Sequence, residues 1–183
     1  MPLHPLHPLH RARILHLSLL AACAMVGCAP TLDWREVRPA GSQLLLLFPC
    51  KPSSQQRRVP LAGPPAMLTL HACSAGGQTW GLAVADVADP ARVASALAAL
   101  SASAMANIGA APSKAANFTV RGATPSPASQ RQLLQGKLPD GVRVTLHTAV
   151  FAHGTLVYQV SVLGEQESAE AADTFLEAVR VQP

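Results

Sequence analysis

Residues 131–162, RQLLQGKLPDGVRVTLHTAVFAHGTLVYQVSV, decide the fold of this chain. Two tight-turn signals, Pro139-Asp140-Gly141 and His153-Gly154, divide the stretch into three segments. In the second and third segments apolar residues recur at every second position, as they do on one face of a strand. The stretch therefore predicts a three-stranded antiparallel meander.

A hairpin precedes the meander. Residues 67–73 and 79–87 flank a Gly76-Gly77 turn and have the composition of strands. In the second of these strands the large side chains, such as Trp80 and Leu82, share one face, and small side chains share the other. The small residues indicate a second layer that lies close against the sheet.

Two segments show the period of amphipathic helices. The first begins at Asp89-Pro90, where the aspartate caps the helix and the proline occupies its first turn, and it ends before Gly109. The second, about residues 168–179, places alanine, phenylalanine, leucine and valine inward and glutamates outward.

Three further strands complete the prediction. Residues 44–48 form an apolar run typical of a strand that is buried on both faces. Prolines confine any strand near residues 58–61 to a sheet edge, and residues 117–121 predict another short strand. The element order predicts one α+β domain over residues 42–183, an antiparallel sheet with two covering α-helices.

The pattern over residues 42–183 resembles secreted domains of the PsbP-like fold. The resemblance is carried by Phe-Pro-x-Lys-Pro at residues 48–52, AVADVADP at 83–90, LVYQVSV at 156–162 and TFLEAV at 174–179. That fold hosts interaction and assembly roles, so the resemblance carries over no functional residue.

The first thirty residues differ in composition from the rest. MPLHPLHPLHRARILHLSLLAACAMVGCAP holds two arginines and no acid, followed by an apolar run at residues 14–27. This order is typical of a secretory signal. The run is shorter than the ~20 residues that a membrane-spanning helix needs.

The end of that run resembles the lipobox of bacterial lipoproteins, whose cysteine becomes the lipidated N-terminus. Residues 20–23, LAAC, fit the usual pattern, whereas residues 25–28, MVGC, depart from it at the methionine. Lipidation at Cys28 leaves an even pair of cysteines behind, whereas lipidation at Cys23 leaves an odd thiol in an oxidising compartment. We therefore predict lipidation at Cys28, with Cys23 as the alternative.

The resemblance implies three parts: a lipoprotein signal peptide at residues 1–27, a lipidated tether at 28–41 and the domain at 42–183. Ala29 is not the aspartate that retains many such lipoproteins in the inner membrane. We therefore expect an outer-membrane anchor of several fatty acyl chains, palmitate among them, with the domain facing the periplasm.

Charge excludes one class of partner. The chain has 14 Lys+Arg and 10 Asp+Glu, and two of its arginines, Arg11 and Arg13, belong to the predicted signal peptide. The remaining basic residues are scattered, and Arg57-Arg58 is their one adjacent pair. Without a basic stripe we expect no nucleic-acid partner, but rather the membrane, through the lipid anchor, and another envelope protein.

Cys50 and Cys73 remain after lipidation, and in an exported protein they predict a disulfide. Both lie at predicted strand ends and have polar neighbours. The alternative is a nucleophilic Cys73 in the sequence Cys-Ser-Ala-Gly-Gly, whose glycines would offer flexible backbone amides. We favour the disulfide.

The histidines after the signal region are His71, His147 and His153. None of them has the spacing of a helical metal pair, and no Cys-x-x-Cys, P-loop or Gly-x-Ser-x-Gly motif occurs. Met67, His71 and Cys73 share one strand face that copper could use. Packing explains them more simply, so we expect no metal site, no cofactor and no catalytic residue.

These expectations favour a lipid-anchored envelope protein that acts as a non-catalytic interaction or assembly module. The alternative is a periplasmic carrier that binds a small ligand or a metal between sheet and helices. Hydrolase or thiol-redox activity is the least favoured class.

Overall fold

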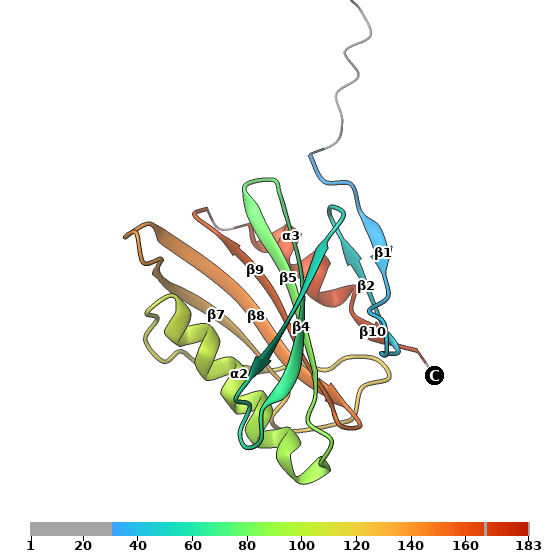
Figure 1. The fold of residues 1–183 in the computed structure, drawn as a ribbon. Helices are drawn as coiled ribbons and strands as arrows, with labels where there is room; N and C mark the ends of the chain where they lie inside the picture. The colour runs from blue at the N-terminus through green and yellow to red at the C-terminus, as the bar shows by residue number, and fades with distance from the viewer. Residues whose placement is uncertain (1–30, 167, 183) are drawn as a thin grey trace, which may run out of the picture. The chain divides into compact units, whose positions relative to one another are not determined.

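The computed structural model describes residues 31–166 and 168–182. Of these residues 44% lie in strands and 18% in helices, so this part of the chain is mostly β. The predicted α+β class, one antiparallel sheet with two covering helices, is therefore wrong. Within the described residues the strands form two sheets, one of three strands and one of seven (Figure 1).

The strands in chain order are β1 (Arg35–Val37), β2 (Leu44–Phe48), β3 (Ser53–Val59), β4 (Ala66–Ala75), β5 (Gln78–Asp86), β6 (Ala116–Asn117), β7 (Gln130–Lys137), β8 (Arg143–His153), β9 (Leu156–Gly164) and β10 (Arg180–Val181). The helices are the 3-10 helix η2 (Pro90–Arg92), α2 (Val93–Asn107) and α3 (Ala169–Glu177).

The large sheet has the order β3-β4-β5-β9-β8-β7-β6, and all its neighbouring strands are antiparallel. This order confirms the predicted hairpin, β4-β5, and the predicted meander, β7-β8-β9. The hairpin and the meander join where β5 pairs with β9. The proline-flanked strand β3 lies at one edge, as predicted, but it covers residues 53–59 rather than the expected 58–61.

Strand β5 is apolar on both faces, which requires a cover on each side of the sheet. On one face Trp80 and Leu82 are fully buried. On the other face Gly81, Ala83 and Ala85 are also buried. The first set packs with β2 and α3, and the alanines of the second set pack with α2, so the sheet lies between two different layers.

The first cover consists of α3 and the small sheet, whose order is β1-β2-β10. Phe175 of α3 lies edge-on against Phe48 of β2 and against Trp80 of β5, with ring centroids 5.2 and 5.4 Å apart. Trp34, just before β1, makes a similar contact with Trp80. These aromatic contacts join α3 and the small sheet to the large sheet.

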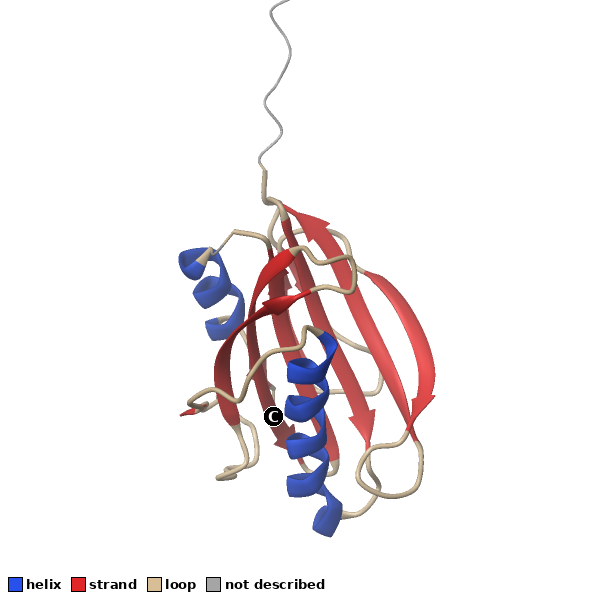
Figure 2. Cartoon of the chain, turned by 90° about the vertical axis from the view of Figure 1, so that its left-hand side faces the viewer, coloured by secondary structure: helices blue, strands red, loops and turns tan. Residues whose placement is uncertain are grey.

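The second cover is α2, which Figure 2 shows in front of the large sheet. Its predicted end is confirmed, since Gly109 follows the helix with a φ of 57°. Its predicted start is not: the Asp89 carboxylate accepts a hydrogen bond from the amide of Ala91 at 2.9 Å and so caps the 3-10 helix η2, and α2 itself begins at Val93. Leu97 and Leu100 are buried against the small residues of β5 and against β8 and β9.

The class prediction failed because it missed the small sheet. Strands β1 and β10 hold three and two residues, too few to show an alternating pattern. Both pair with β2, and β1 lies in the predicted tether, so residues 35–37 of that segment belong to the small sheet. The strand expected at residues 117–121 is also shorter, since β6 ends at Asn117.

Arg92 holds the loop between β3 and β4 against the start of α2. Its guanidinium donates to the carbonyl oxygens of Val87, Leu61 and Pro64 at 2.8, 3.1 and 2.9 Å. Gly63 lies against the same group: its φ of 136° would strain any other residue, and an added Cβ would be only 3.0 Å from Nε of Arg92. This arginine therefore has a structural role.

We predict that Arg92→Ala lowers the free energy of unfolding by about 2 kcal/mol, because it leaves several carbonyls without their charged donor. Urea denaturation of the purified protein measures this. Arg143→Ala is the control, since Arg143 is exposed and its loss changes the free energy by less than about 0.5 kcal/mol. Equal midpoints for the two variants would contradict this role.

Candidate functional site

One candidate site is a groove between α2 and the large sheet, which we call the α2 groove. It has a volume of about 270 Å³. Leu68 and Leu70 of β4 form one wall, and Ile108, after the end of α2, forms the other with Leu163 of β9. Leu68 is buried but Leu70 is 38% exposed, so the groove presents apolar surface to solvent.

Small residues form the floor of the α2 groove. Ala72, Gly81 and Ala83 leave the backbone of β4 and β5 close to its surface. Gly81 pairs with Ser161 of β9, and a Cβ on Gly81 would lie 2.8 Å from the Ser161 hydroxyl oxygen. The glycine therefore provides the space in which this hydroxyl reaches the floor.

A polar stripe borders the apolar floor. Nε2 of Gln159 lies 3.2 Å from the hydroxyl oxygen of Thr148 and 3.4 Å from the carbonyl oxygen of Leu100, and it donates to both. Nearby on the same face, Oε1 of the buried Gln132 has no hydrogen-bond partner among the described residues. The stripe lies between the two apolar clusters of this face.

The outer rim of the α2 groove is basic. Arg57 of β3 lines the groove, whereas Arg58 points to the opposite face of the sheet, because their partners in β4 are the successive residues Leu68 and Met67. The sequence contains no acidic residue between Glu36 and Asp86. The β3-β4 edge of the sheet therefore carries only positive formal charge.

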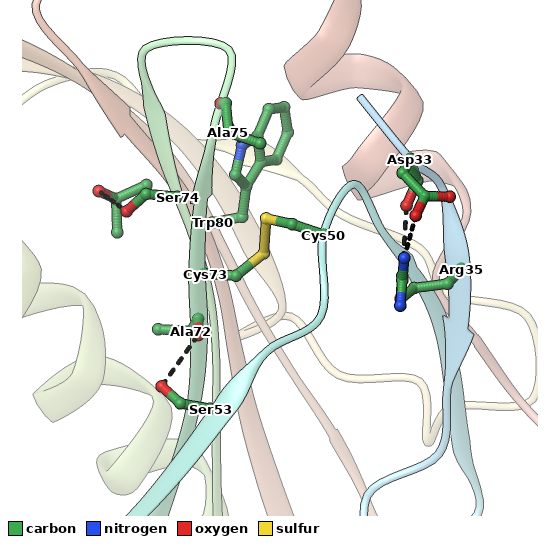
Figure 3. Close-up of a disulfide and its surroundings, with 10 residues drawn as sticks. Asp33, Arg35, Cys50, Ser53, Ala72, Cys73, Ser74, Ala75 and Trp80 are labelled. Carbon is green, nitrogen blue, oxygen red and sulfur yellow. Dashed lines mark hydrogen bonds and ion pairs between the residues drawn. A yellow bond between two sulfur atoms is a disulfide. The ribbon is translucent and has the colours of Figure 1, made fainter. Parts of the chain in front are cut away.

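The predicted disulfide between Cys50 and Cys73 is confirmed (Figure 3), with Cα atoms 6.0 Å apart. It joins the end of β2 in the small sheet to β4 in the large sheet. Trp80 lies beside Cys73 in the register, and its indole Nε1 donates to the carbonyl oxygen of Ala75 at 3.0 Å. While the Cys50–Cys73 disulfide exists, Cys73 is neither a nucleophile nor a metal ligand.

The structure separates the histidines that the sequence singled out. His71 lies on β4, where burial lowers its pKa below the ordinary value of 6.5. His147 is buried on β8 and His153 ends that strand. Residues 31–166 and 168–182 contain no group of three or more His, Cys, Asp or Glu that could hold a metal ion. Because Cys73 is oxidised in the disulfide, the β4 face that it shares with Met67 and His71 offers no thiolate ligand for copper.

A second pocket, of about 680 Å³, lies within the loop of residues 117–129 and against β8. Phe118 and Phe151 contribute apolar wall, with ring centroids 6.1 Å apart. The buried hydroxyl oxygen of Ser129 has no hydrogen-bond partner in the described part of the chain. We call this the loop pocket. Sequence reasoning missed it, because its proline-rich rim predicts only an irregular loop.

The predicted lipidation sites, Cys28 and the alternative Cys23, lie outside the described residues. Within the described residues, no helix is both long and apolar enough to cross a membrane.

No family model matches this chain, and no curated protein matches it. The PsbP-like and lipobox resemblances therefore stay predictions, and the functional argument depends on the residues of the structure itself.

We predict that the double variant Cys50→Ser/Cys73→Ser loses about 3.5 kcal/mol of unfolding free energy in the chain-entropy model, because the bond closes a loop with a sequence separation of 23. Urea denaturation measures this loss, and reduced wild-type protein should match the variant. Mass spectrometry of the non-reduced protein should show two hydrogen atoms fewer than the reduced form. Two thiols that react freely with an alkylating agent would contradict the disulfide.

Proposed function

We propose that this protein is a non-catalytic binding module of the bacterial cell envelope, anchored in the outer membrane by lipid on Cys28 and exposed to the periplasm. The observation that carries the proposal is the Cys50–Cys73 disulfide. Such bonds persist in oxidising compartments and are rare in the cytosol, so the folded unit has the chemistry of an exported protein.

The α2 groove supports binding rather than catalysis. Among the described residues its lining combines leucine, isoleucine and alanine with a few neutral polar groups and Arg57, and it includes no Asp, Glu, His or Cys. Thr79 and Ser161 offer hydroxyls, but no neighbouring base in that lining would activate them. Partly exposed apolar surface with a few hydrogen-bonding groups is typical of a recognition site.

The loop pocket favours a second candidate, a carrier of a small apolar molecule that bears one hydrogen-bonding group. Its volume of about 680 Å³ suits such a ligand. The unpaired hydroxyl of Ser129 would meet the polar group of that ligand. A thermal-shift screen of wild type against Ser129→Ala separates the candidates, since only a carrier loses its ligand response in the variant.

Lipid labelling tests the anchor. In cells that export the protein and are fed a palmitate analogue, wild type and Cys23→Ser should incorporate the label, whereas Cys28→Ser should not. The reason is that only the lipidated cysteine carries the acyl groups. If only Cys23→Ser loses the label, the lipidated residue is Cys23 rather than Cys28. Label absent from wild type would overturn the envelope part of the proposal.

Photo-cross-linking in the same cells tests the binding part. A cross-linking side chain in place of Leu70 should yield a discrete adduct, because this position lies in the α2 groove. The matched control is Leu133 on β7, which is 44% exposed and outside the groove. No adduct at Leu70, or the same adduct at both positions, would contradict a binding role for the groove.

A further inference from the structure

Strand β3 is an open edge of the large sheet. It pairs with β4 on one side, and no other described strand pairs with it on the other. Six of its seven residues are exposed, and it contains no proline. Alternate amide and carbonyl groups of an edge strand point away from the sheet, so β3 offers a template on which a further strand can pair.

The charge of this edge indicates which strand would bind. Lys51, Arg57 and Arg58 are exposed and form no ion pair or hydrogen bond through their side chains with other described residues. No acidic residue lies between Glu36 and Asp86 to balance them. An added strand with carboxylates would supply the missing counter-charge, which favours both affinity and register.

Arg57 and Arg58 point in opposite directions, which favours an added strand over a lipid surface as the binding partner. Arg57 points to the α2 face and Arg58 to the opposite face. A flat anionic membrane that lies against one face of the sheet contacts only the arginine on that face. Neighbouring residues of an added strand alternate between the faces in the same way, so two adjacent carboxylates meet both arginines.

We propose that an extended acidic segment of a partner protein pairs with β3 as an eighth strand of the large sheet, with adjacent carboxylates on Arg57 and Arg58. This inference rests on the proposed binding function and names the class of partner. A second copy of this chain is a poorer occupant, because its β3 would bring the same positive charges to the edge.

The test uses the full chain and three fluorescent peptides of equal length, rich in valine and threonine, with binding measured by anisotropy. One peptide carries two adjacent glutamates, a second carries them two positions apart, and a third is the first with alternate backbone amides methylated. The adjacent pair should bind about threefold tighter than the spaced pair, because spacing by two places both carboxylates on one face. Methylation should abolish binding, because it removes strand hydrogen bonds.

Variants of the full chain assign the contact. Arg57→Gln and Arg58→Gln should each weaken binding of the adjacent-glutamate peptide by about threefold, with a smaller effect at high salt. Arg143→Gln, an exposed arginine on β8, is the matched control and should bind like wild type.

Where a peptide binds, four outcomes would still overturn the proposal. They are peptide binding that survives methylation, equal binding of the two glutamate spacings, binding to anionic vesicles that both arginine variants retain, and self-association of the free chain that blocks the peptide. If no peptide binds while the adduct at Leu70 forms, the acidic-strand proposal fails and the binding function stands. If neither is seen, both fail.

Discussion

The structure depends on one constraint: the central strand β5 is apolar on both faces. Trp80 and Leu82 on one side and Ala83 and Ala85 on the other are all buried. Each face needs a cover, because exposing a large apolar side chain such as Trp80 or Leu82 costs roughly 1.5–3 kcal/mol. The remaining elements supply these covers.

The two covers are built differently, and this difference leaves the recognition surfaces open. Against the large side chains, α3 and the small sheet are held by edge-on aromatic contacts and by the Cys50–Cys73 disulfide. Against the small side chains lies a single helix, α2, which cannot span seven strands. The part of the sheet at β3 and β4 that it leaves open contains the α2 groove and the basic edge.

Strong local patterns explain what could be predicted from sequence. Alternation and glycine turns located the hairpin and the meander, Asp89-Pro90 and Gly109 bounded the helical segment formed by η2 and α2, and an even cysteine count predicted the disulfide. The α+β class was wrong because β1 and β10 are too short to show a period and form through pairing with β2. Only tertiary structure brings residues of α2, β4 and β9 together into a groove, so no run of sequence signals it.

Hydrogen exchange of the free protein, read residue by residue, tests most directly whether β3 is an open edge beside an incomplete cover. An open edge predicts that alternate amides of β3 exchange close to the unprotected rate, while their neighbours, bonded to β4, are slower. The amides of β5, paired on both sides by β4 and β9, should exchange only on global unfolding. Uniform protection along β3, as strong as that of β5, would show that the edge is already paired and would contradict its role as a docking strand.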